Sequence, residues 1–177
     1  MNAALCRRGA AITVALAVLI HLAAVWSVPW LVTGLFMRRA VAQAGVNRMA
    51  TPPLPDDTSR GVVAPSPDQL YAACLFDIGN GRVRITAHRA TDYWSLALYD
   101  TNADNFFHIG TADAGRDEVE LILGREPTAG ALPEGAIYVH TPHDTGVLLA
   151  RFLVLDRAHP DAAETARASV HCKPVEG

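Results

Sequence analysis

The stretch RVRITAH, residues 82–88, decides the fold class because its side chains alternate strictly between apolar and polar. The two sets lie on opposite faces of an extended chain: Val83, Ile85 and Ala87 on one, Arg82, Arg84 and Thr86 on the other. A period of two is typical of a β-strand that is buried on one side only. We therefore predict a strand here, packed against an apolar core.

Six further short apolar runs surround this strand, each bounded by Gly, Pro or Asp. They are LYAACLF (70–76), YWSLALY (93–99), FFHIG (106–110), EVELIL (118–123), AIYVHT (136–141) and VLLARFLVL (147–155). About seven short strands at this spacing predict an all-β sandwich or roll. The run PDAAETARASV (160–170) differs, because its alanine content and its Pro–Asp start predict a short C-terminal helix.

The N-terminal part of the chain is suited to hydrocarbon rather than to water. Residues 10–37 hold no formal charge over 28 positions, and about 20 apolar residues are enough to cross a bilayer as a helix. We predict a transmembrane helix that acts as an uncleaved signal anchor, after a basic tail at residues 1–9. A cleaved signal peptide is the competing interpretation, because Ala-Val-Ala at 40–42 has the spacing of a cleavage site.

The N-terminal part and the rest of the chain also differ in net charge. Residues 1–50 carry five arginines and no acid, whereas the rest carries ten bases and all eighteen acids, a net charge of −8. Such a domain repels a phosphate backbone, so we expect no nucleic-acid partner. Arg7 and Arg8 favour a cytoplasmic N-terminus, and Arg38 and Arg39 argue the reverse. We expect a single-pass inner-membrane protein whose C-terminal domain is periplasmic.

Prolines separate the anchor from the folded part. Residues 38–67 contain five of them and predict an extended tether. The β-domain is predicted over residues 68–157, and a C-terminal helix and tail over 158–177. Cys74 and Cys172 follow the predicted span and could pair in an oxidising compartment.

The segment LYDTNADNF, residues 98–106, has the spacing of a calcium loop. Asp100, Asn102 and Asp104 match loop positions 1, 3 and 5, but position 12 is Thr111, which cannot supply a bidentate carboxylate. The flanking residues alternate like strands rather than helices. We therefore predict a tight turn and expect no metal or cofactor, although another calcium geometry stays open.

Arg151 is the main candidate for a binding residue. Its run, VLLARFLVL, is apolar on both faces, which predicts a central strand and a partly buried guanidinium. Such a group needs a partner, and Asp77 and Asp100, each at the end of a strand, are the candidates. The contact is either a structural ion pair or part of an anion-binding pocket.

Four stretches together resemble the family of unknown function DUF1254: DQLYAACLFD (68–77), YWSLALYDTNADNFF (93–107), LPEG (132–135) and TPHDTGVLLAR (141–151). The matching positions include Asp68, Tyr71, Asp77, Tyr93, Trp94, Ser95, Asp100, Asn105, Phe107, Pro142 and Arg151. The resemblance implies a jelly-roll-like β-sandwich, usually followed in the same chain by a second β-rich domain, DUF1214. Because the chain stops soon after Arg151, it also implies a separate chain that supplies the complementary domain.

Catalytic signatures are missing from the sequence: there is no G-x-S-x-G, no H-E-x-x-H and no glycine-rich phosphate loop. The leading hypothesis is a non-catalytic envelope protein that associates with a partner chain or with itself. The alternative is an anion-binding, sugar-binding or hydrolytic domain. Its candidate residues are Arg151 with Asp77 and Asp100, joined by Asn105 and by Tyr93 as a stacking surface.

Overall fold

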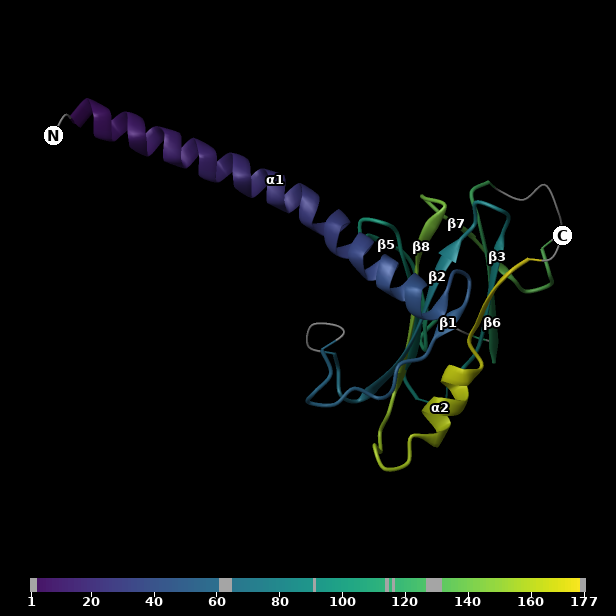
Figure 1. Ribbon diagram of the computed structural model, residues 1–177. Coiled ribbons are helices and arrows are strands. Elements are labelled where there is room, and N and C mark those ends of the chain that lie inside the picture. The colour runs from purple at the N-terminus through teal and green to yellow at the C-terminus, as the bar shows by residue number, and fades with distance from the viewer. Residues whose placement is uncertain are drawn as a thin grey trace.

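The computed structural model describes residues 3–60, 65–90, 92–113, 115, 117–126 and 132–175. Figure 1 shows one long helix that projects from a two-layer β-domain, with a short helix at the far end of that domain. The five-stranded sheet A has the order β1-β2-β8-β4-β5, and the four-stranded sheet B has the order β7-β6-β3-β9. The protein is therefore mostly β, as the sequence predicts.

The elements follow one another along the chain as α1 (Ala3–Ala44), β1 (Met49–Ala50), β2 (Gln69–Asp77), β3 (Val83–His88), β4 (Trp94–Tyr99), β5 (Asn105–Gly110), β6 (Glu118–Gly124), β7 (Ile137–His140), β8 (Thr145–Leu153), α2 (Asp161–Ala168) and β9 (His171–Pro174). All seven predicted strands are present. The described residues contain two more, β1 and β9, which are too short for a period of two to be visible in the sequence.

The core lies between the two sheets and follows the predicted alternation. In β3 the side chains of Val83, Ile85 and Ala87 are completely buried. The largest fully buried side chains, Trp94, Phe76 and Phe152, come from three adjacent strands of sheet A. The central position of β8, between β2 and β4, explains why its run is apolar on both faces.

Helix α1 extends further at both ends than the predicted span of residues 10–37. It contains one stretch, Arg7–Arg39, that is long and apolar enough to cross a membrane, a property that a signal sequence shares. The helix ends at Gly45, whose φ of +84° suits glycine and whose N–H donates to Val41 O at 2.9 Å. Toward this end α1 touches the β-domain, where the ring of Trp30 makes an edge contact with His143 at 6.3 Å between centroids.

The predicted tether, residues 38–67, differs from the structure in its first part. Its beginning belongs to α1, and Met49 and Ala50 pair with β2 opposite Cys74 and Ala73. Further along, Leu54 packs against the core. The physical reason is that β2 would otherwise present an unpaired edge, and the apolar side chains among the prolines gain from burial.

Sheet B extends beyond the predicted domain boundary at residue 157. After α2 the chain returns as β9, which pairs with β3 at Ile85↔Cys172 and Thr86↔His171. The structure joins Cys172 to Cys74 of β2 by a disulfide, so the bond links sheet B to sheet A.

Candidate functional site

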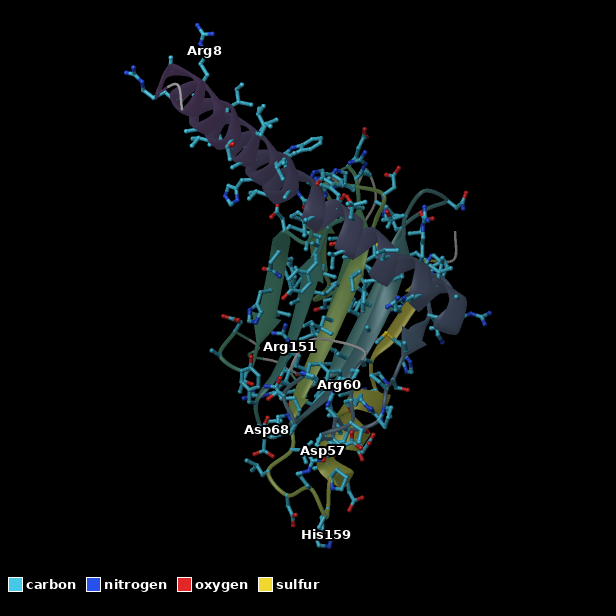
Figure 2. All side chains as sticks on the ribbon, turned by 60° about the vertical axis from the view of Figure 1, so that its left-hand side comes forward. Arg8, Asp57, Arg60, Asp68, Arg151 and His159 are labelled. Atoms are coloured by element: carbon cyan, nitrogen blue, oxygen red, sulfur yellow. A yellow bond between two sulfur atoms is a disulfide. The ribbon has the colours of Figure 1, made fainter. Side chains whose placement is uncertain are left out.

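Arg151 lies in the middle of sheet A, on the face that points away from sheet B. Its neighbours along β8, Ala150 and Phe152, point into the core and are completely buried, so alternation places Arg151 on the outer face. In register it lies between Tyr71 of β2 and Ser95 of β4. Figure 2 shows Arg151 in the lower half of the sheet, below the point where α1 crosses it.

The guanidinium of Arg151 has no carboxylate partner among the described residues. Its Nη2 donates a long hydrogen bond of 3.4 Å to the hydroxyl of Tyr99 on the neighbouring strand. A half-buried arginine with only this contact is unusual, because a guanidinium carries five donors. Among the described residues, no acid compensates the positive charge of Arg151 on the outer face of sheet A.

The expected pairing of Arg151 with Asp77 or Asp100 does not occur. Asp77 pairs in register with Thr145, six positions along β8 from Arg151, which corresponds to about 20 Å of strand. Asp100 directly follows Tyr99, whose register partner is Val147, so it lies toward the same distant end. The sequence shows that both acids close strands, but which end of β8 they reach depends on the antiparallel register.

Asp77 has a structural role at its strand end. Its Oδ1 accepts a hydrogen bond of 2.8 Å from Gly79 N, which shapes the turn toward β3. Its main chain is bonded to the side chain of Asn47. Asp77 therefore anchors a turn and the end of α1.

Asp100 organises the loop that resembles a calcium site. Its side chain is only 8% exposed, and Oδ1 accepts hydrogen bonds of 3.0 Å from the amides of Asn102 and Asp104. The other oxygen, Oδ2, lies 3.5 Å from His143 Nδ1. The left-handed residue of this loop is Ala103, with φ of 70°. These contacts are those of a tight turn, as the sequence predicts.

Asn105 and Tyr93 occupy opposite ends of the β4–β5 hairpin. Asn105 Nδ2 donates to the carbonyls of Leu98 and Phe107, both at 3.2 Å, where the register shifts. This amide supports an irregular point in the ladder. Tyr93 is 45% exposed, and strand alternation places it on the same outer face as Ser95. Of these two candidates, only Tyr93 lies beside the Arg151 region.

Ser95 is a site residue that reasoning from the sequence missed. Its side chain is completely buried, and its Oγ has no hydrogen-bond partner among the described residues. On the other side of it lies Gly110 of β5. A Cβ built on Gly110 would lie 3.3 Å from His108 Cε1 and 3.7 Å from Ser95 Cβ, so the imidazole lies beside Ser95.

The sequence feature that could have pointed to Ser95 and Tyr99 is the alternation of side chains in YWSLALY, residues 93–99. It puts Ser95 and Tyr99 on the face opposite Trp94, yet it does not reveal which residue of β8 they oppose. The described residues contain no group of three or more His, Cys, Asp or Glu side chains that could hold a metal ion. The arrangement offers one cation and several neutral hydroxyl groups, which suits anion recognition better than proton transfer.

A family match spans both sheets and identifies the chain. The family described as "Protein of unknown function (DUF1254)" matches residues 46–174. The chain belongs to the DUF1254 family. The matched region begins just before β1 and ends with β9, so the DUF1254 domain includes the two strands that lie outside the predicted boundaries. Helix α1 lies entirely outside the match.

Two solved structures share the fold of this DUF1254 domain. The VPA0106 protein from Vibrio parahaemolyticus aligns with a TM-score of 0.60 at 12% identity, over 81% of this chain and 35% of that chain. A putative uncharacterized protein from Burkholderia cenocepacia aligns with a TM-score of 0.51 at 22% identity, over 81% of this chain and 40% of that one. The present chain thus matches well under half of each, and at these identities the likeness concerns the fold alone. No curated protein matches the chain.

A second surface feature of the DUF1254 domain lies where β1 and β9 approach each other. An open groove of about 560 Å³ is lined by Asn47, Arg48, Met49, Thr51, Arg167, Ala168, Val170, His171, Cys172, Lys173 and Pro174. Arg167 is held by an ion pair with Glu164 and by Pro52 O. The groove is basic on an acidic domain, because Arg48, Arg167 and Lys173 are among its lining residues.

Proposed function

We propose that this protein is a membrane-anchored, non-catalytic β-domain of the bacterial envelope that associates with a partner chain. The observation that supports the anchor is the apolar stretch Arg7–Arg39 of α1, whose most apolar window is not buried at all within the protein. An apolar surface of this length is stable in hydrocarbon and unfavourable in water.

The contacts of α1 favour a span shorter than residues 10–37. Every residue from 9 to 26 is exposed, and partial burial begins at Ser27, where the helix approaches the β-domain. A helix of 18 residues is about 27 Å long, close to the hydrocarbon thickness of about 30 Å. Trp26 and Trp30 then lie near the headgroups, where aromatic rings are favoured.

The location of the domain is part of the same proposal. Disulfides persist in oxidising compartments, so the Cys74–Cys172 bond supports a periplasmic domain. Arg7 and Arg8, at the free end of α1, support a cytoplasmic N-terminus. We therefore infer a single pass through the inner membrane, with the DUF1254 domain outside the cytoplasm.

Strand β5 supports partner binding because it is the least protected edge of the sheets. No described strand pairs with its outer side, and its six residues include no proline and no Asp, Glu, Lys or Arg. The other edges are two to four residues long, and β9 carries Lys173 and Pro174. An open edge of this kind accepts a strand from another chain. We assign it to a β-rich domain of a separate protein, with self-association as the second candidate.

The finer description of the sandwich as jelly-roll-like belongs to this proposal too. Its support is the pairing of β2 with β8, whose nine register pairs join residues 68 to 84 positions apart in the sequence.

Carbonate extraction of bacterial membranes that contain the full chain tests the anchor. The variant Leu19→Arg/Ile20→Arg places two charges in the proposed span, each costing about 2.5–3.5 kcal/mol at the centre of a bilayer. Leu155→Arg is the matched control, since Leu155 is similarly exposed but belongs to the β-domain. We expect the unchanged chain and the control to stay in the pellet and the double variant to be released. An intact mass that lacks residues 1–42 would instead show a cleaved signal peptide.

A photo-crosslinking residue at position 108 tests the partner. We expect it to give one discrete product in membranes that contains a β-rich protein or a second copy of the chain. The same residue at Leu155 is the control, and equal products from both positions would contradict an interface at β5.

A further inference from the structure

We propose that the outer face of sheet A binds a carboxylate carried on a small flat or apolar molecule, with Arg151 as the cationic anchor. This site is independent of the proposed anchor and partner. It uses none of the acids that the sequence assigned to Arg151, and it adds Ser95 and Tyr99, which the sequence did not assign.

The first support is the charge of Arg151. Its only hydrogen bond to a described residue goes from Nη2 to the neutral Tyr99 hydroxyl at 3.4 Å. A guanidinium prefers a carboxylate, which it binds through two parallel hydrogen bonds. A ligand carboxylate would give Arg151 the partner that the fold does not supply.

The second support is Ser95, which directly opposes Arg151 in the register of β4 and β8. Its Oγ is buried and lacks a partner among the described residues. Buried hydroxyl groups almost always form a hydrogen bond, so an unsatisfied one beside an uncompensated cation points to a missing acceptor. One ligand oxygen can accept from Ser95 and the other from Arg151.

Two further side chains, Tyr71 and His108, flank this pair on the outer face of sheet A. Tyr71 lies opposite Arg151 on β2, and its hydroxyl is already engaged with Ser66 N and Gln69 Oε1. Tyr71 is therefore a wall rather than a donor. On the other side the exposed ring of His108 lies over Gly110, next to Ser95.

No described acid forms an ion pair with Arg151. Asp68, which Figure 2 shows below Arg151, lies in the turn before β2 and accepts a hydrogen bond of 2.5 Å from Ser66 Oγ. Tyr93, on the same face and half exposed, offers a ring against which the body of a ligand can stack. The site therefore selects for a carboxylate attached to a flat or apolar group.

The test uses the full chain in detergent micelles, with benzoate as the probe and benzamide as its neutral counterpart. We expect benzoate to raise the melting temperature with increasing concentration at constant ionic strength, and benzamide to leave it unchanged. A peptide with a free C-terminal phenylalanine, compared with its amide, distinguishes a chain terminus from a free small acid as the natural source of the carboxylate.

Substitutions test whether Arg151 and Ser95 are responsible for the binding of benzoate. We expect Arg151→Gln and Ser95→Ala each to weaken benzoate binding about tenfold or more, since each loses a charge-assisted hydrogen bond. Arg84→Gln is the matched control, because Arg84 is paired with Glu120 at 2.7 Å on sheet B. Without ligand, Ser95→Ala should melt at or above the temperature of the unchanged chain. The proposal is overturned if benzoate has no effect on the unchanged chain, or if Arg84→Gln weakens binding as much as Arg151→Gln.

Discussion

The side-chain amide of Asn47 exchanges two hydrogen bonds with the main chain of Asp77. Nδ2 donates to Asp77 O at 2.9 Å, and Asp77 N donates to Oδ1 at 2.8 Å. The main-chain N–H of Asn47 also donates to Leu75 O at 2.8 Å. The amide thus continues the ladder between β1 and β2 and fixes the end of α1 to sheet A.

Two substitutions at Asn47 separate its hydrogen bonds from its backbone conformation. Asn47→Gly removes both side-chain bonds, and we expect it to lower the free energy of unfolding by about 1–3 kcal/mol. Asn47 has φ of 55°, so Asn47→Ala should cost about 1 kcal/mol more than glycine. Urea unfolding followed by circular dichroism measures both, and equal effects of the two variants would contradict the role of the left-handed conformation.

The disulfide between Cys74 and Cys172 closes a long loop, with a sequence separation of 98. Because such a cross-link restricts the unfolded chain, we expect Cys172→Ser to lower the free energy of unfolding by about 2–5 kcal/mol. The matched control is Cys6→Ser, which should leave it unchanged. Urea midpoints with and without a reductant provide the measurement, and identical midpoints would rule out a stabilising bond.

Gly146 allows the closest approach between β8 and its neighbours. A Cβ at this position would overlap Phe76 Cζ and lie 2.5 Å from Tyr99 O, a backbone atom that cannot move freely. We expect Gly146→Ala to lower stability by about 3 kcal/mol, at the upper end of overpacking effects. Gly115→Ala is the control, since a Cβ there meets nothing within 4 Å. Thermal melting of both variants decides the matter, and equal melting temperatures would refute the clash.

Substitutions at Asp100, with and without calcium, distinguish a tight turn from a calcium site. Asp100→Ala removes the acceptor of the Asn102 and Asp104 amides, and we expect a loss of about 1–3 kcal/mol. Asp100→Asn keeps one side-chain oxygen as an acceptor and should lose less. Added calcium should not change the melting temperature of the unchanged chain. A rise that disappears in Asp100→Asn would restore the metal interpretation.

Local patterns predicted the strands because their causes are local. In β3 the period of two follows directly from the pleat, so Val83, Ile85 and Ala87 could be assigned to the core without a partner strand. The turn at Asp100 was equally predictable, since short polar side chains bond to their own backbone. The apolar composition of α1 likewise shows, without reference to the rest of the chain, that the helix is long and apolar enough to cross a membrane.

The candidate site was predicted only in part, because it depends on register. Arg151 was recognised from its place in an apolar run, yet Asp77 lies about 20 Å away along β8 and Asp100 lies toward the same end. Ser95 and Tyr99 could be placed on the outer face of β4 but not opposite any particular residue. Register depends on contacts between segments about 50 residues apart, which a local pattern does not contain.

The sequence by itself determined the class of each segment: an apolar helix, short strands of period two, a tight turn and a short C-terminal helix. These follow from backbone geometry and from the solvent that each side chain prefers. Only the tertiary structure decided that β1 and β9 complete the sheets, that Cys74 lies beside Cys172, and that Arg151 faces Ser95 and not an acid. Those relationships arise from packing between remote segments, where burial and hydrogen bonding of the whole domain select one register among many.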